Sequence, residues 1–467
     1  MNDPVKRVNG SFRDPNGSVF TRDGGLYRSV EEGYKETYDH LMNSGLYDEL
    51  VRRRILIPHE EVDPDIDSRT RCCRVLKPKK VDFVSYPYEW SFSQLKDAAL
   101  ATLEVQRHAL DYGMSLKDAS AYNMQFVDGK PCLIDTLSFE KYAEGKPWVA
   151  YRQFCQHFLA PLALMCRKDI RLSQLLRVHI DGIPLDMAGA LLPARSWLAS
   201  GLLIHVHLHS LSQRHYADKS MNVKIARSKF SLKSFMGLLG SLSACIEKLD
   251  WKVKRTAWAD YYDRSVLSEE YVRNKEALVR RYVELVKPHS VWDLGSNTGL
   301  FSRIASDKGI QTISFDADPA CVEANYLECK ARNETHLLPL VLDVTNPSPA
   351  IGWENRERMS LMERGPADMI LALALVHHLA LGNNLPFDML AGFFNALCTW
   401  LIIEFVPKDD PKAERLIGMR TDMFHAYSRE EFENAFKSAF DIREAARVDG
   451  SERYLYLMKS TRGSKQQ

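Results

Sequence analysis

A glycine-rich turn is the part of this 467-residue sequence whose residue types best suit ligand binding. Residues 293–299 (DLGSNTG) follow the short apolar run Val291-Trp292 and precede a helical pattern. Gly295 and Gly299 carry no Cβ atom, so the backbone can turn sharply there and approach a ligand closely. The first amides of the following helix can donate hydrogen bonds to that ligand. The segment predicts a strand, a turn and a helix with a ligand at the turn.

Acidic and imidazole side chains recur at the ends of the strands predicted downstream. The predicted strands are residues 312–315, 338–342, 368–375 and 400–403, and they lead into Asp316, Asp343, the pair His377-His378 and Glu404. In open α/β sheets, ligands bind at the carboxyl ends of the strands. Doubly wound nucleotide-binding folds place a carboxylate for the ribose hydroxyls about twenty residues after the glycine turn, which is the position of Asp316.

Residues 293–299 resemble the first motif of the class I S-adenosylmethionine-dependent methyltransferases, and the resemblance extends over roughly residues 260–460. It implies S-adenosylmethionine as the cofactor. Asp293 and Gly295 would lie by the methionine part of this cofactor, Asp316 would hold its ribose, Asp343 would face its adenine and Leu373 would line the far wall. The cofactor-binding residues implied are Asp293, Gly295, Ser296, Gly299, Asp316, Ala317, Asp343, Val344 and Leu373.

Two side chains are candidates for a catalytic role in methyl transfer. The electrophile is already activated, so the protein mainly aligns the acceptor, excludes water and removes a proton. His378 and Glu404 follow predicted strands and could accept that proton. Adjacent histidines point in different directions, so at most one of His377 and His378 should face the site. The alternatives are a histidine bonded to the backbone at a helix start, and a Glu404 that pairs with a basic residue.

The N-terminal half contains a second constellation, residues 116–135. The sequence VDGK at 127–130 predicts a hairpin turn, which would bring Asn123 and Asp135 side by side. The arrangement resembles the catalytic loop and metal-binding hairpin of the protein-kinase and aminoglycoside-kinase superfamily. By that resemblance Asp118 would be the catalytic aspartate, and Asn123 and Asp135 the magnesium ligands.

This constellation departs from the kinase pattern. Leu116-Lys117 replaces His-Arg, Thr136-Leu137 replaces Phe-Gly, and the glycine-rich loop with its lysine is missing upstream. We therefore expect a degenerate kinase-like module that shapes or recruits the methyl acceptor. The rival hypothesis is an active phosphotransferase.

The elements that position these residues divide the chain into two domains. We predict an α+β, mostly helical N-terminal domain over residues 1–221, which carries the kinase-like resemblance, and a doubly wound Rossmann-like methyltransferase domain over 258–460. A basic helical linker over 222–257 joins them, with nucleic-acid binding as the alternative role of its lysines and arginines. Residues 461–467 form a disordered tail. Tyr261, Tyr262 and Lys275 are candidates for a lid over the cofactor.

Composition narrows the function classes. The formal net charge is +1, so bulk attraction to nucleic acid or membranes is not expected. The nine cysteines show no Cys-x-x-Cys spacing, no apolar signal segment opens the sequence, and no apolar run reaches membrane-spanning length. We expect a cytoplasmic protein with no metal and no membrane partner. His205, His207 and His209 would share one face of a strand, but their surroundings are helical, which argues against a metal site.

These observations together predict a methyltransferase. It would transfer a methyl group from S-adenosylmethionine to an oxygen or nitrogen atom of a small-molecule or glycan-like acceptor. An Asn-Pro-Pro-Tyr-like segment is missing after the fourth strand, which disfavours an exocyclic nucleobase amine as the acceptor. The alternatives are an RNA methyltransferase that uses the basic linker, and a non-catalytic cofactor-binding or kinase-like regulatory module.

Overall fold

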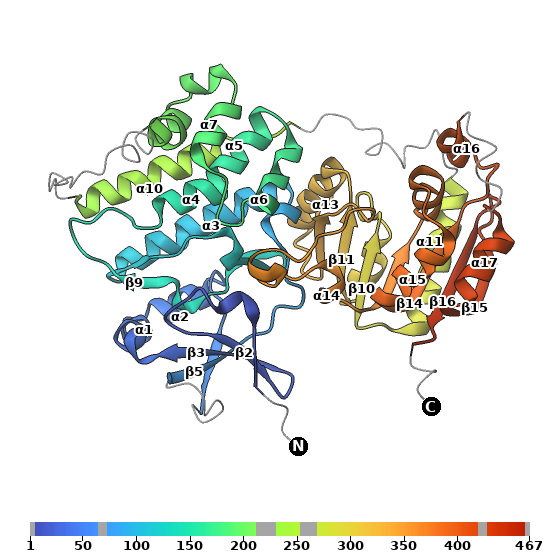
Figure 1. Cartoon of the computed structure of the whole chain (residues 1–467), viewed down its shortest axis with the longest axis horizontal. Helices are drawn as coiled ribbons and strands as arrows, with labels where there is room; N and C mark the ends of the chain where they lie inside the picture. The colour runs from blue at the N-terminus through green and yellow to red at the C-terminus, as the bar shows by residue number, and fades with distance from the viewer. Residues whose placement is uncertain (1–4, 64–71, 212–229, 253–268, 419–426, 463–467) are drawn as a thin grey trace. The chain divides into compact units, whose positions relative to one another are not determined.

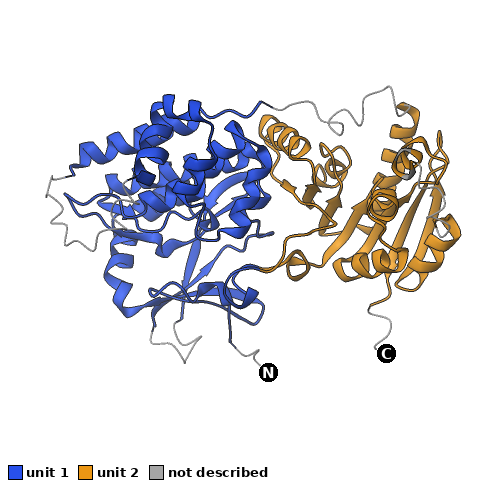
Figure 2. Ribbon diagram, turned by 45° about the horizontal axis from the view of Figure 1, so that its top comes forward, with its two compact units in different colours: residues 1–252, 351–358 blue, residues 253–350, 359–467 orange. Residues whose placement is uncertain are grey.

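The computed structural model describes residues 5–63, 72–211, 230–252, 269–418 and 427–462. The chain divides into two compact units (Figure 2). Unit 1 comprises residues 1–252 with 351–358, and unit 2 comprises 253–350 with 359–467. The candidate lid residues Tyr261 and Tyr262 lie outside the described residues.

Unit 2 is built on a seven-stranded mixed sheet (Figure 1). Its strands are β10 (Ser290–Leu294), β11 (Gln311–Asp316), β12 (Leu337–Val341), β13 (Ala367–Ala372), β14 (Cys398–Phe405), β15 (Phe440–Arg447) and β16 (Tyr454–Ser460). The strand order is β12-β11-β10-β13-β14-β16-β15. The first five strands are parallel, and β16 pairs antiparallel with both β14 and β15. Parallel pairing brings the carboxyl ends of β10, β11, β13 and β14 to one edge, as predicted.

The helices of unit 2 follow the strands in alternation, which makes this unit an α/β fold. They are α11 (Glu269–Val286), α12 (Ser302–Ser306), α13 (Pro319–Arg332), α14 (Leu361–Arg364), η12 (His378–Gly382), α15 (Phe387–Leu397), α16 (Pro411–Ile417) and α17 (Arg429–Lys437). Residue Asp318 caps α13 by accepting from Ala320 N at 2.9 Å, and Asn333 ends it in the left-handed conformation.

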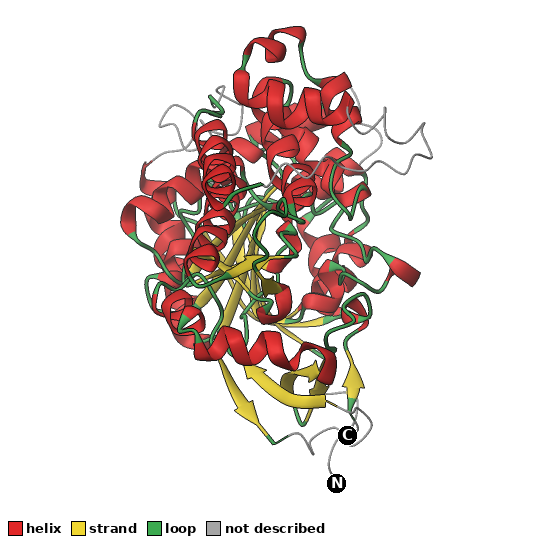
Figure 3. Ribbon diagram, turned by 90° about the vertical axis from the view of Figure 1, so that its left-hand side faces the viewer, coloured by secondary structure: helices red, strands yellow, loops and turns green. Residues whose placement is uncertain are grey.

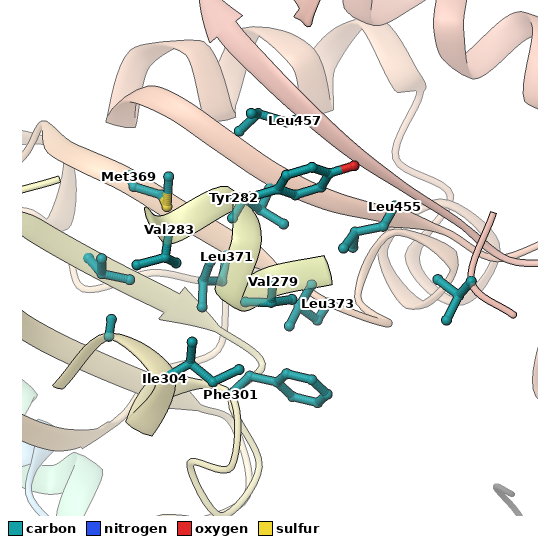
Figure 4. Close-up of a cluster of buried hydrophobic side chains, with 14 of the residues drawn as sticks. Val279, Tyr282, Val283, Phe301, Ile304, Met369, Leu371, Leu373, Leu455 and Leu457 are labelled. Carbon is teal, nitrogen blue, oxygen red and sulfur yellow. The ribbon is translucent and has the colours of Figure 1, made fainter. Parts of the chain in front are cut away.

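Helix α11 packs its apolar face against the sheet in a large hydrophobic cluster (Figure 4). Val279, Tyr282 and Val283 of α11 meet side chains of β13, β16 and α12. Apolar residues three and four apart along α11 make one continuous stripe, so the helix lies along the sheet. This packing holds the end of α11 that begins at Glu269 near the strand ends, where Tyr271 and Lys275 are located.

Unit 1 combines a small antiparallel sheet with a larger helical part (Figure 3). The sheet order is β1-β2-β3-β5-β4, from β1 (Lys6–Arg7), β2 (Val19–Arg22), β3 (Gly25–Glu31), β4 (His59–Val62) and β5 (Cys72–Pro78). Helices α1 (Lys35–Asn43) and α2 (Leu46–Arg52) join β3 to β4. The helical part contains α3 (Phe92–Asp111), α4 (Tyr151–Phe154), α5 (Ala160–Arg167), α6 (Leu175–Val178), α7 (Leu185–Leu191), α8 (Ser200–Leu202) and α10 (Leu232–Glu247).

The predicted hairpin of unit 1 is confirmed. Strands β7 (Met124–Val127) and β8 (Lys130–Leu133) pair around Asp128 and Gly129, whose φ angles are +50° and +75° as a primed turn requires. Strands β6 (Met114–Leu116) and β9 (Phe139–Lys141) pair nearby. Helix α3 begins at a capping box between Ser91 and Gln94, which are joined by reciprocal hydrogen bonds of 2.8 and 3.3 Å.

Other boundaries differ from the sequence predictions. Helix α10 lies within the predicted linker, yet its residues belong to unit 1. Strand β13 ends at Ala372 although the apolar sequence continues to Leu375, because Ala374 has a φ of +50° and leaves the extended conformation. Among the described residues, no helix is long and apolar enough to cross a membrane.

Candidate functional site

The glycine turn sits at the carboxyl end of β10, the central strand of the parallel part of the sheet. The amides of Gly295 and Ser296 both donate to the carbonyl of Phe315 on β11, at 2.8 and 2.9 Å. Gly295 and Gly299 have φ angles of +76° and +84°, which side-chain-bearing residues rarely adopt. A Cβ atom on Gly299 would lie 2.6 Å from the Asn325 side chain, so packing also requires glycine there.

Asp316 ends β11 beside this turn. Its Oδ2 atom accepts from Asn297 N at 2.7 Å and its Oδ1 atom from Asp318 N at 2.8 Å. Burial raises the pKa of Asp316, and these backbone donors act in the opposite direction. The carboxylate is half-buried and fixed in orientation, while each oxygen keeps a further lone pair that could accept from a hydroxyl group.

Asp293 lies on β10 just before the turn and is buried. Its Oδ2 atom accepts a hydrogen bond of 2.6 Å from the Ser302 hydroxyl. Burial raises the pKa of Asp293 to about 7, while the Ser302 bond and the Lys275 ammonium lower it. The predicted cofactor residue is therefore an enclosed carboxyl group that titrates near neutrality.

The remaining predicted cofactor residues differ in how exposed their side chains are. Asp343 and Ala317 are exposed and Val344 is half-buried, whereas Ser296 and Leu373 are buried. Asp343 accepts from the amide and hydroxyl of Thr345 at 2.8 and 2.7 Å, which forms an Asx turn after β12. Leu373 belongs to the hydrophobic cluster beneath α11 (Figure 4).

Glu404 is fully buried at the end of β14, inside a set of hydrogen-bond donors. Its Oε2 atom accepts from Lys275 Nζ at 2.5 Å and from Ala374 N at 2.7 Å, and its Oε1 atom accepts from the Tyr271 hydroxyl. Burial alone would raise the pKa of Glu404, but Lys275 and Arg453 hold that pKa below its ordinary value. The carboxylate is ionised and occupied by protein donors.

Arg453 extends this network toward the loop after β14. Its guanidinium donates to the Tyr271 hydroxyl at 3.0 Å and to both oxygens of Asp410 at 2.8 and 3.1 Å. Sequence reasoning missed Tyr271 and Arg453, and considered Lys275 only as a lid residue. One signal was present, because Tyr271 and Lys275 are four residues apart and so share one face of a helix. No such spacing in the sequence connects Arg453, which directly precedes β16, to Tyr271 or Lys275.

His377 and His378 follow β13 at the start of the short helix η12. Their ring centroids are 4.1 Å apart. His377 is fully buried, and neither ring nitrogen has a hydrogen-bond partner among the described residues. His378 is half-buried, and burial lowers its pKa to about 4, with Lys412 and Arg453 acting in the same direction. His378 is thus the more accessible of the two imidazoles, and it is neutral at pH 7.

In unit 1 the hairpin brings Asn123 and Asp135 together, joined through the Ser138 hydroxyl. Asn123 Nδ2 donates to Ser138 Oγ at 3.3 Å, and Ser138 Oγ donates to Asp135 Oδ2 at 2.9 Å. The other oxygen, Oδ1, is 2.9 Å from the guanidinium of Arg28 on β3, which also pairs with Asp14. Arg28 therefore supplies a positive charge next to Asp135 from within the protein.

Asp118 lies in the loop before the hairpin. Its Oδ1 atom accepts from Ser120 N at 3.0 Å, and burial raises its pKa, with the neighbouring Asp135 charge adding to that effect. The adjacent Lys117 ammonium lies 4.4 Å from the centroid of the Tyr34 ring. The charge of Asp135 acts on both Asp118 and Lys117, so the three side chains lie in one neighbourhood.

The histidines at 205, 207 and 209 are on a helix and bind protein groups. His205 contacts the Tyr151 and Ser241 hydroxyls at 2.8 and 2.9 Å, and His207 contacts Ser196 at 2.8 Å. Across the part of the chain that the structure describes, no group of three His, Cys, Asp or Glu side chains is arranged to hold a metal ion.

The comparisons with known proteins identify one full-length relative. The chain is 34% identical to the nodulation protein NoeA of Rhizobium meliloti (strain 1021) over 459 residues, which cover 97% of this chain and 96% of NoeA. No protein-family model matches.

Two solved structures resemble less than half of the chain each. The N-methyltransferase NodS of Bradyrhizobium japonicum WM9 is 10% identical with a TM-score of 0.29, over 41% of this chain and 98% of NodS. The bifunctional kinase-methyltransferase WbdD is 14% identical with a TM-score of 0.30, over 43% of this chain and 42% of WbdD. Likenesses at this level identify neither a ligand nor a substrate.

Proposed function

The chain belongs to the family of the nodulation protein NoeA, and we propose that it is a methyltransferase that uses S-adenosylmethionine. The observation that carries this proposal is the turn after β10 together with Asp316 at the end of β11. The turn brings backbone to the sheet edge with no Cβ atom at Gly295 and Gly299, and Asp316 holds a carboxylate beside it in a fixed orientation. Residues 293–299 also match the first motif of class I methyltransferases.

The described residues fit this cofactor. Asp316 would accept the ribose hydroxyls, Gly295 and Gly299 would let the cofactor approach the backbone, and Asp293 and Ser296 would support the turn from below. Asp343, Val344 and Ala317 would flank the adenine at the ends of the neighbouring strands, and Leu373 would close the apolar side. When bound, S-adenosylmethionine supplies an activated methyl group.

We assign proton removal from the acceptor to His378. It is the accessible imidazole at the carboxyl end of β13, and its neutral ring can accept a proton as a weak base, since burial lowers its pKa to about 4. Glu404 is less suited to this step, because Tyr271, Lys275 and Ala374 already donate to its carboxylate. The acceptor would be an oxygen or nitrogen atom of a polar small molecule or a glycan-like compound. The name of the relative suggests that this acceptor takes part in nodulation.

The experiment that tests the cofactor is a calorimetric titration of the full chain with S-adenosylmethionine and S-adenosylhomocysteine. We expect one-to-one binding, weakened by about 1.5–3 kcal/mol in Asp316→Ala because a hydrogen bond to a charged group is lost. Asp307→Ala is the matched control, since Asp307 is an exposed carboxylate in the same unit. If the folded wild-type chain binds neither compound, the methyltransferase assignment fails.

For unit 1 we propose a kinase-like module that no longer transfers phosphate and instead recruits the acceptor. The sheet order with two helices between β3 and β4, followed by the Asn123–Asp135 hairpin, supports the kinase-like part of the proposal. The Arg28 guanidinium beside Asp135 supports the loss of phosphate transfer, because it occupies the carboxylate that a magnesium ion would need.

Magnesium-ATP should therefore leave the unfolding temperature of the full chain unchanged, as measured by differential scanning fluorimetry. The same measurement on Arg28→Ala serves as the comparison, because this substitution removes the guanidinium beside the Asp135 carboxylate. An upward shift in the wild-type chain that disappears in Asp135→Ala would contradict this proposal.

A further inference from the structure

The hydrogen bonds to Glu404 include one from a residue whose backbone conformation is unfavourable. One of its donors is the amide of Ala374, a residue with a φ of +50°. The left-handed conformation is unfavourable for residues with a Cβ atom, and it persists only where surrounding contacts enforce it. Glu404 Oε2, 2.7 Å from this amide, is such a contact.

The Ala374 turn directs two neighbouring parts of the proposed site. The Leu375 side chain packs on the glycine turn, with Cδ1 3.3 Å from the place that a Cβ on Gly295 would take. The Leu375 carbonyl accepts from His378 N at 3.0 Å and from Leu379 N at 3.2 Å, which starts η12. The conformation of Ala374 therefore sets both the wall against the glycine turn and the place of His378.

Two further donors hold Glu404 in place, and a third group supports one of them. Lys275 Nζ and the Tyr271 hydroxyl come from α11, and Arg453 Nη1 reaches the Tyr271 hydroxyl at 3.0 Å from the segment before β16. The Lys275 ammonium also lies 4.7 Å from the Phe301 ring, and its charge lowers the pKa of Asp293 beneath the glycine turn. The network thus connects α11 to the ends of β10, β13 and β14.

We propose that Glu404, Lys275 and Tyr271 are positioning residues that act through Ala374. Their carboxylate, ammonium and hydroxyl groups hold Ala374 in the left-handed conformation. Ala374 in turn fixes the positions of the glycine turn and of His378. This inference rests on the proposed methyltransferase function for its effect on cofactor affinity. The effect on Ala374 itself is independent of any ligand.

The test combines two measurements on the full chain: calorimetric titration with S-adenosylhomocysteine, and hydrogen exchange of the peptide over residues 372–378. Removing Glu404 alone would leave a buried ammonium unpaired and endanger folding, so Lys275→Met and Glu404→Gln are made together. We expect this pair to weaken binding by about tenfold or more, as supporting contacts typically do, and to speed exchange at Ala374.

Adding Ala374→Gly to that pair gives the decisive variant. Glycine adopts a positive φ without steric cost, so the turn should need the carboxylate less and part of the lost affinity should return. The control is Lys308→Met with Glu284→Gln, which removes a more exposed ion pair of 2.8 Å in unit 2. This control should bind and exchange like the wild-type chain.

Two results would overturn the inference. One is a folded Lys275→Met/Glu404→Gln chain with wild-type affinity and wild-type exchange. The other is a loss of affinity that Ala374→Gly does not reduce, since the network would then act by another route. If the double variant does not fold, Tyr271→Phe replaces it, and unchanged exchange at Ala374 in that variant would equally overturn the inference. If the wild-type chain binds no S-adenosylhomocysteine, the proposed function fails, and the exchange comparison still decides the role of Glu404.

Discussion

At the scale of single residues, Asp293 shows how burial converts an ordinary carboxyl group into one that titrates near neutrality. An unperturbed aspartate has a pKa of about 3.9, and burial raises the pKa of Asp293 to about 7. The folded state therefore binds a proton more tightly than the unfolded state. This contribution to stability is fully present below the unfolded pKa and is lost as the pH rises through the folded pKa.

Asp293→Asn should remove this dependence, since an amide does not titrate. We expect the free energy of unfolding of the wild-type chain to fall, relative to that of the variant, between pH 5 and pH 8, values that bracket the pKa of about 7. Hydrogen exchange of the β10 amides measures this free energy in unit 2. An equal difference between the two chains at both pH values would show that Asp293 is ionised throughout.

The same scale separates Glu404 from His378, although the sequence suggests similar roles for both. Each follows a predicted strand of the sheet. The structure encloses Glu404 among Tyr271, Lys275 and Ala374, whereas it leaves part of His378 accessible. A side chain's position at a strand end follows from the sequence pattern, but the donors around it come from α11 and from the segment before β16, which are distant in the chain.

At the scale of elements, sequence periodicity and turn chemistry were sufficient for much of the fold. The turn at Asp128-Gly129 predicted the β7–β8 pairing, and short apolar runs predicted the five parallel strands. Local propensity acts within a few residues, so such elements are visible in the sequence. The end of β13 was not predicted, because the apolar residues continue past Ala372. The chain turns at Ala374, whose amide bonds to Glu404, a residue distant in the sequence.

Element boundaries in the middle of the chain were harder to predict for a related reason. The basic composition of residues 222–257 suggested a solvated linker, yet α10 buries Phe235, Leu239 and Leu242 within unit 1. Of the lysines and arginines in this segment, only Lys233 lies within α10, so the basic composition describes the flanking residues and not the helix itself. The assignment of α10 to unit 1 depends on which surface these apolar residues pack against. Amino-acid composition does not specify that surface.

At the scale of the whole molecule, each unit has its own core. The cluster under α11 belongs to unit 2, and a separate cluster that includes Val30, Tyr38 and Leu76 belongs to unit 1. Multidomain chains commonly unfold in more than one transition. We therefore expect two transitions in scanning calorimetry of the full chain, each reporting on one core.

S-adenosylhomocysteine should raise only one of these transitions. A ligand that binds the folded state at 100 times its Kd stabilises that state by about 2.7 kcal/mol, and the proposed site lies wholly within unit 2. Asp316→Ala should reduce the shift and so identify the responding transition as that of unit 2. A single transition that shifts as a whole would show instead that the two units unfold together, because the free energy of binding would then stabilise both cores at once.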